Sequence, residues 1–97
     1  MTISIIIPTH QEEKNIGKLV RYLKEFSTQA VYEIIVSDGG SDDNTIKEAE
    51  NAGAKALISP IKERSAQMHH AASISKGDIL YFVHADTFPP TSFERDI

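Results

Sequence analysis

The sequence has 97 residues, of which 40% are hydrophobic and 25% charged, an ordinary composition for one globular domain. Ten basic and fourteen acidic side chains give a formal net charge of −4, so no overall positive field exists to gather nucleic acid or anionic lipid. The absence of cysteine excludes a disulfide framework, a thiolate zinc site and a cysteine nucleophile, and makes a reducing compartment the expected location.

The first part of the chain alternates strand and helix signals. A β-branched run, residues 4–8, ends in proline and is typical of a strand buried on both faces. Apolar residues then recur at helical spacing and predict a helix over residues 12–26. Thr9 together with Glu12, or Asn15 alone, could cap the start of that helix.

The same alternation continues through the middle of the chain. Residues 32–36 predict a second buried strand, and the polar cluster 37–43 predicts a turn that leads into a second helix near Thr45. Gly53 suits the position just past the end of that helix, and a weaker third strand is expected over residues 54–58.

The last part adds one more helix and strand. A helix is predicted over residues 63–76, with Gly77 as its stop, followed by the most apolar strand, residues 79–83. Strands that alternate with helices need right-handed crossovers and a mainly parallel sheet covered by helices on both faces. The fold class is therefore α/β, built as one domain over residues 1–97.

Polar clusters follow three of the predicted strands: Thr9 with His10, residues 38–43, and residues 84–86. Open parallel sheets bind their ligands at the carboxyl ends of the strands. Strand-end loops are polar in every α/β protein, so the conjunction of the clusters, and no single one, indicates a site.

Asp38 is the first candidate ligand-binding residue. It ends the second strand, where its carboxylate could accept a hydrogen bond from a nucleobase N–H; the alternative is a cap for the following helix. For Asp42 and Asp43, capping is the preferred interpretation.

His84, Asp86 and Arg64 are the remaining candidates. His84 and Asp86 lie two apart, so in extended chain both side chains could face one divalent cation or its bound phosphates. The alternative makes Asp86 the cap of a turn at residues 89–90 and His84 an ordinary packed histidine. Arg64 opens the third helix and could neutralise a diphosphate, or could be a solvated surface arginine.

Several known signatures are absent. No G-x-G-x-x-G follows the first strand and no G-x-x-x-x-G-K-[ST] occurs, which excludes the dinucleotide and P-loop fingerprints. His69 and His70 are adjacent on a helix and project about 100° apart, so they do not form a metal-binding pair. Both are expected on the surface or in packing.

Three stretches resemble, in order and spacing, the inverting family 2 glycosyltransferases: residues 5–15, 37–45 and 84–86. The resemblance spans the whole chain. It implies a GT-A, Rossmann-like parallel sheet of strand order 3-2-1-4. Such a sheet is flanked by helices and binds a nucleotide-sugar donor, usually with Mg²⁺ or Mn²⁺. Carried over by position, it assigns to the metal Asp86 and to the nucleotide Pro8, Thr9, Glu12, Asp38, Arg64 and His84.

His84 departs from the family pattern, because an aspartate usually stands there. Together with residues 63–68, the His-Ala-Asp turn resembles a bacterial subgroup linked to arsenosugar biosynthesis. The family keeps its catalytic base in the second half of the domain, and no residue here matches it. The resemblance therefore implies the donor-binding half of a glycosyltransferase, inactive by itself. A UDP-sugar is the first guess for the donor, and the acceptor is not indicated.

Three alternatives stay open. One is a nucleotide-binding module without catalysis, which His84 allows. A second is a sugar nucleotidyltransferase, although such enzymes normally carry a glycine-rich loop after the first strand, and residues 8–11 contain no glycine. A third is a generic flavodoxin-like or receiver domain, in which the proline-terminated strand and the His-Ala-Asp turn would have no role.

The sequence also predicts the cellular location of the protein and its self-association. The apolar run at residues 5–7 is too short for a signal peptide and lacks a basic leader, so a cytoplasmic location is expected, with membrane association through other segments of a longer protein left open. If the sheet continues beyond these residues, the aromatic rings of Phe82, Phe88 and Phe93 should be under-covered, and the chain should self-associate.

Overall fold

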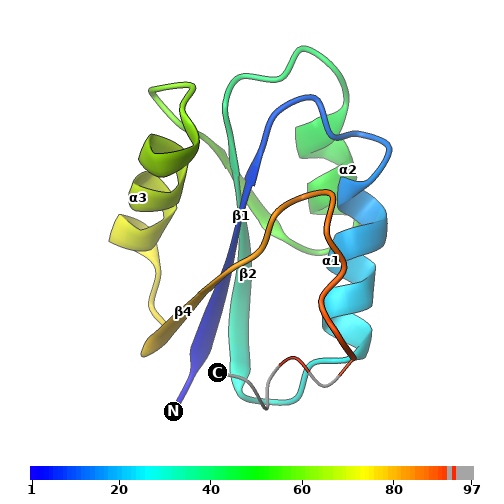
Figure 1. Ribbon diagram of the computed structural model, residues 1–97, viewed down its shortest axis with the longest axis vertical. Helices are drawn as coiled ribbons and strands as arrows, with labels where there is room; N and C mark the ends of the chain where they lie inside the picture. Colours follow the sequence, from blue (N-terminus) through cyan, green and yellow to red (C-terminus); the bar gives the residue numbers. More distant parts are fainter. Residues whose placement is uncertain (92, 94–97) are drawn as a thin grey trace.

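The computed structural model describes residues 1–91 and Phe93. A parallel sheet forms the centre of the molecule (Figure 1). Its four strands lie in the order β3-β2-β1-β4. The strands are β1 (Ile3–Thr9), β2 (Val31–Asp38), β3 (Lys55–Ile58) and β4 (Ile79–Phe82). The predicted α/β class and the strand order 3-2-1-4 are both confirmed.

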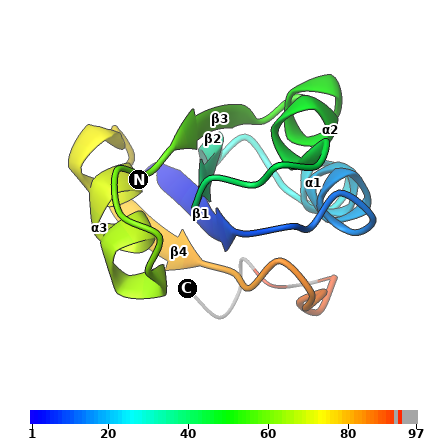
Figure 2. The ribbon, with the colours of Figure 1, turned by 90° about the horizontal axis from the view of Figure 1, so that it is seen from above.

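Three helices cover the two faces of the sheet. They are α1 (Ile16–Glu25), α2 (Thr45–Asn51) and α3 (Arg64–Ile74). Seen from above, α1 and α2 lie together on one face and α3 lies alone on the other (Figure 2). No helix in the described part of the chain is long and apolar enough to cross a membrane.

The alternation of side chains along β1 divides the core into two layers. Ile5 and Ile7 point into the larger cluster, which includes Leu19 and Leu23 of α1. Ile6 points the other way, into a smaller cluster with Ala71 of α3. Because both faces are covered, every residue of β1 is buried, which is why the strand reads as a continuous apolar run.

Helix α1 begins later than predicted, at Ile16 instead of Glu12. Glu12 belongs to the loop before the helix, and its backbone N–H donates to the hydroxyl of Thr45, 2.8 Å away. Thr9 is the last residue of β1 and does not cap the helix, and Asn15 makes no side-chain cap hydrogen bond. The prediction that Thr9 caps the helix is therefore wrong, because its hydroxyl donates to Asp38. Asn15 stands at the predicted N-cap position, but its side chain donates to Oε1 of Glu12 in the same loop.

Two predicted glycine stops have different outcomes. Gly53 follows the end of α2 with φ of +102°, as expected just past a helix C-terminus. Helix α3, in contrast, ends at Ile74, before Gly77. A Cβ on Gly77 would lie 2.5 Å from Oγ of Ser4 and 2.6 Å from its backbone nitrogen, so this glycine permits a close approach to β1.

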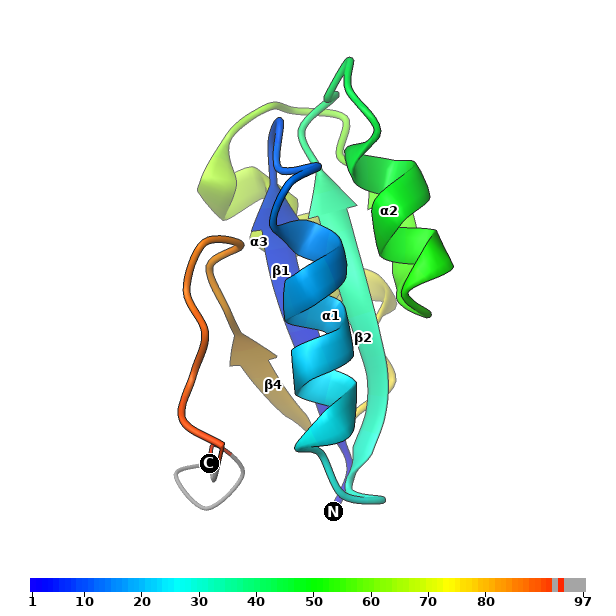
Figure 3. The same ribbon diagram turned by 90° about the vertical axis from the view of Figure 1, so that its right-hand side faces the viewer.

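After β4 the chain turns back and runs beside α1 (Figure 3). The hydroxyl of Tyr22 donates to the carbonyl of Pro89, and the rings of Tyr22 and Phe88 meet edge to face at 5.1 Å. Phe93 is fully buried and stacks on Tyr81 with ring centroids 5.7 Å apart. The expectation of an under-covered ring is therefore wrong for Phe93.

The other two aromatic rings are open, as predicted. Phe82 is 42% exposed and Phe88 47% exposed. Phe82 ends β4, which is an edge strand of the four-stranded sheet because it pairs only with β1 among the described strands.

Candidate functional site at the carboxyl ends of the strands

The loops that follow β1 and β2 are hydrogen-bonded to each other. Among the described residues, six hydrogen bonds join positions 11–13 to positions 41–45. The side chain of Gln11 donates to Oδ1 of Asp42 and accepts from the Asp42 N–H, at 2.6 and 2.8 Å. Gln11 takes a φ of +55°, which is unusual for a residue other than glycine and brings its amide into this pairing.

Capping at the start of α2 is carried by one of the two predicted aspartates. Oδ1 of Asp43 accepts a hydrogen bond from the Thr45 N–H at 3.0 Å. Burial acts to raise the pKa of Asp43, but the hydrogen bonds from Thr45 and from the Glu13 backbone lower it by more, and the pKa lies below its ordinary value. Asp42 bonds to Gln11 instead, so the capping prediction is confirmed for Asp43 and wrong for Asp42.

Asp38 is fully buried at the end of β2. Its Oδ1 accepts from the hydroxyls of Thr9 and Ser41, and its Oδ2 accepts from the N–H groups of Gly40 and Ser41, at 2.6 to 3.0 Å. A carboxylate offers about four acceptor positions, so this one is filled by its own surroundings. Contact with a nucleobase stays a prediction, and it would require one of these hydrogen bonds to be exchanged.

A pocket of about 270 Å³ opens at the carboxyl ends of β1 and β4, beside the first turn of α3. It brings together five of the seven predicted site residues: Pro8, Thr9, Glu12, Arg64 and Asp86. Its lining also includes His10, Lys62, Glu63, Gln67 and Ala85. We call this hollow the strand-end pocket.

The two remaining predicted residues, Asp38 and His84, lie outside that lining. His84 lines a separate hollow of about 40 Å³ together with Pro8, Met68 and the end of β4. Its carbonyl accepts from the Thr87 N–H at 3.1 Å, which closes a turn and breaks the extended geometry after β4. His84 and Asp86 therefore border different hollows, and a cation shared by both stays a prediction.

Gln67 is a pocket residue that the sequence analysis did not identify. It is 5% exposed, and its Nε2 donates to the carbonyls of Thr9 and Ser37 at 2.8 and 2.9 Å. The amide thus ties α3 to the carboxyl ends of two adjacent strands. A single buried glutamine on a helix face gives no sequence signal for such a contact, because it depends on how the helix crosses the sheet.

The acidic groups at the pocket do not form a metal cage by themselves. Within residues 1–91 and Phe93, no three His, Asp or Glu side chains gather where they could hold one ion. Asp86 is exposed and lines the pocket with Lys62 and Arg64. A hard cation that takes one carboxylate from the protein and further oxygens from a bound diphosphate is compatible with this arrangement.

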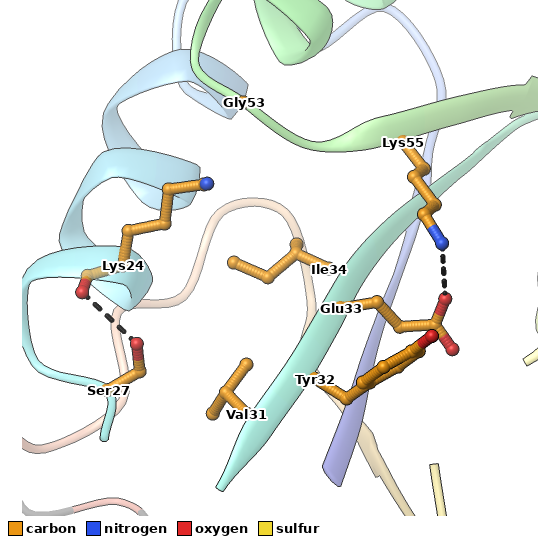
Figure 4. A pocket seen from close by; sticks show the side chains of 8 residues that line it. All are labelled: Lys24, Ser27, Val31, Tyr32, Glu33, Ile34, Gly53 and Lys55. Carbon is orange, nitrogen blue, oxygen red and sulfur yellow. Dashed lines mark hydrogen bonds and ion pairs between the residues drawn. The ribbon is translucent and has the colours of Figure 1, made fainter. Parts of the chain in front are cut away.

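A larger hollow, of about 360 Å³, lies at the opposite ends of the strands (Figure 4). It is bordered by the start of β2, the start of β3 and the end of α1. Inside it, Nζ of Lys55 lies 2.9 Å from Oε1 of Glu33, the one ion pair among the described residues. None of the predicted site residues lies there.

Glu33 is held by groups from several segments. Its Oε2 accepts from the Ser4 hydroxyl and from the Lys76 N–H, both at 2.7 Å. Burial acts to raise the pKa of Glu33, but these hydrogen bonds and the Lys55 ammonium lower it by more, so the pKa lies below its ordinary value. The same bond to Glu33 raises the pKa of Lys55. These interactions give Glu33 and Lys55 a structural role, because they join β1, β2, β3 and the segment after α3.

The sequence profile of Glycosyl transferase family 2 matches residues 4–95. The chain belongs to this family. The strand order and the helix layers are those of its GT-A fold, as the resemblance implied. The finer resemblance to the His-Ala-Asp subgroup stays a prediction.

Individual relatives agree with the family. The chain is 31% identical to glucosyl-3-phosphoglycerate synthase of Mycolicibacterium smegmatis, over 92% of this chain and 32% of that protein. It is 35% identical to 4,4'-diaponeurosporenoate glycosyltransferase of Staphylococcus haemolyticus, over 88% of this chain and 24% of that protein.

Solved structures give the same result. The chain superposes on glucosyl-3-phosphoglycerate synthase from Mycobacterium tuberculosis, crystallised with Mn²⁺, UDP-glucose and phosphoglyceric acid, with a TM-score of 0.86 at 25% identity. That superposition covers 97% of this chain and 36% of the other. The chain thus spans about a third or less of the length of these relatives.

Proposed function

We propose that this chain is the donor-binding part of a glycosyltransferase that uses a nucleoside-diphosphate sugar, with a UDP-sugar as the first candidate. The observation that carries the proposal is the strand-end pocket, in which Arg64 and Lys62 stand beside Asp86. A diphosphate needs cationic groups on one side, and a divalent cation bound to it needs a carboxylate on the other.

Helix α3 adds to the charge at this pocket. It begins at Arg64, so its first turn, with backbone N–H groups that lack helical partners, lies at the pocket. The positive end of a helix dipole favours an anion. Arg64 and Lys62 would therefore hold the diphosphate, Pro8 and Thr9 would border the nucleoside, and Glu12 would face its ribose side.

Asp86 would hold the divalent cation, Mg²⁺ or Mn²⁺. When bound, such an ion stabilises the negative charge that builds on the phosphate oxygens as the nucleoside diphosphate leaves. His84 would contribute through the small hollow that it shares with Pro8. Asp38 would hold the loop that follows β2 in place through its hydrogen bonds to Gly40 and Ser41. No residue of this chain is assigned as the base that deprotonates the acceptor.

Two other functions remain as alternatives to glycosyl transfer. A nucleotide-binding module without catalysis would use the same pocket, and a longer chain with no acidic residue placed as a base would favour it. A sugar nucleotidyltransferase would need a basic glycine-rich loop, and the loop after β1 contains none. The family membership favours the transferase over both.

Calorimetric titration of UDP with Mn²⁺ tests the proposed donor site. We expect Arg64→Ala to weaken binding by roughly tenfold or more, because a charge-assisted hydrogen bond is lost. Arg21→Ala, on the exposed face of α1, is the matched control and should bind as the wild type does. Equal binding by the wild type and Arg64→Ala would remove Arg64 from the site, and no binding of any nucleotide would reject the proposal.

A further inference from the structure

The amide of Gln67 has a fixed orientation. A side-chain amide has two N–H donors, and both are directed at backbone carbonyls, those of Thr9 and Ser37. Because a flipped amide would bring its oxygen against the same two carbonyls, the flipped state is unfavourable. Oε1 of Gln67 therefore stays on the side away from the two strands.

Among the described residues, no group donates to this oxygen. In the described part of the chain, no hydrogen bond reaches Oε1 of Gln67, and the only fully buried side-chain polar atom without a partner is Oγ of Ser37. Oε1 is therefore reached from the strand-end pocket, which Gln67 lines. A lone acceptor held in a nearly buried position is ready for a ligand donor.

A second feature keeps the space beside this oxygen open. An added Cβ on Gly39 would lie 3.2 Å from Oε1 of Gln67 and 3.2 Å from Cγ of Lys62. The stem of Lys62 therefore runs past Gly39 next to the acceptor. Glycine at this position leaves room that any side chain would narrow.

We propose that Gln67 reads the nucleobase of the donor: Oε1 accepts the imide N–H of a uracil-type base. The inference rests on the proposed function and deepens it. Asp38 is a poorer reader, because all its acceptor positions are occupied. Cytosine presents a ring-nitrogen acceptor where uracil presents its N–H, so it would set two acceptors against each other.

Calorimetry on the wild-type protein gives the first test, with UDP, CDP and 3-methyl-UDP, which lacks the N–H. We expect UDP to bind at least roughly tenfold more tightly than either analogue, as for a site built around one donor. Equal affinity for UDP and 3-methyl-UDP would overturn the inference and leave the proposed function standing. Failure of all three to bind would reject the proposed function and this inference with it.

Variants of Gln67 distinguish recognition of the base from a structural role in the pocket. In Gln67→Met we expect UDP to weaken to the affinity of CDP, while CDP itself changes by less than about twofold. Gln29→Met, in the exposed loop between α1 and β2, is the matched control and should keep the wild-type preference. If all three nucleotides weaken by the same factor, Gln67 supports the pocket without reading the base, and the inference is wrong.

A second variant covers the case in which Gln67→Met does not fold. Gln67→Lys keeps N–H donors for the carbonyls of Thr9 and Ser37 but has no acceptor. It should likewise lose the preference for UDP over CDP. Retention of the wild-type preference in a folded Gln67→Lys protein would overturn the inference.

Discussion

The hydroxyl of Thr9 donates to Oδ1 of Asp38 over 2.8 Å, and this bond joins the last residues of two neighbouring parallel strands. Asp38→Asn replaces one acceptor oxygen with a donor that would face N–H or O–H groups. We expect a loss of about 2 to 3 kcal/mol in the free energy of unfolding, measured by urea denaturation. Asp42→Asn, at an exposed position, should lose less than about 1 kcal/mol.

The carboxylate of Glu33 predicts a specific pH dependence of stability. Its pKa in the folded protein lies below the ordinary value of 4.5, so its stabilising contribution is complete above about pH 4.5 and is lost as the pH falls through the folded-state pKa. Glu33→Gln should therefore show a shallower loss of stability in acid than the wild type. Glu25→Gln, at an exposed position, is the control, and a profile for Glu33→Gln as steep as that of the wild type would contradict the prediction.

Two glycine-to-alanine changes should have opposite signs. In Gly77→Ala the new Cβ would press on the backbone of Ser4, and we expect a loss of about 1 to 3 kcal/mol. In Gly17→Ala the nearest atom, 3.0 Å away, belongs to the flexible end of Arg21, and the change lies inside α1. There we expect a gain of about 0.5 to 1 kcal/mol. Thermal unfolding of both variants gives the comparison.

Asp86 predicts coupling between metal and nucleotide. UDP should bind more tightly with Mn²⁺ than with a chelator present, by about 1 to 3 kcal/mol, because each ligand lowers the charge penalty of the other. Asp86→Ala should abolish that difference in calorimetry, whereas Asp78→Ala, at the far end of the sheet, should keep it. Metal-independent binding by all three proteins would show that nucleotide binding needs no cation at Asp86.

The exposed edge of the sheet predicts self-association. Phe82 is 42% exposed at the end of the edge strand β4, and unpaired edges with apolar side chains associate. The mass measured by light scattering should rise with concentration in the wild type and rise less in Phe82→Lys. A constant monomer mass for the wild type at high concentration would show that the β4 edge does not mediate self-association.

The architecture could be predicted from the sequence because its signals are local. Apolar runs bounded by turn residues indicated four strands, and helical spacing at Ile16, Leu19, Val20 and Leu23 indicated the face of α1 that is buried. The start of α1 could not be predicted in this way. Its position depends on hydrogen bonds between two loops about thirty residues apart, which no local pattern contains.

The grouping of residues at the candidate site was predicted in part. Residues that border the strand-end pocket were found because carboxyl ends of parallel strands share one edge, as with Arg64 and Asp86. The separation of His84 from Asp86 was missed, because a turn after β4 replaces the extended backbone that the two-residue spacing assumed. Burial of Phe93 was missed because it depends on the return of the chain along α1.

The pairing of the first two loops also limits how such a chain can change during evolution. Gln11 and Asp42 form hydrogen bonds with each other across the two loops. If one loop became longer, the polar groups of the other loop would lose these hydrogen-bond partners. Insertions should therefore arise in both loops together or be confined to connections outside this pair. Changes in loop length are then directed to segments that the hydrogen bonds between these two loops do not constrain.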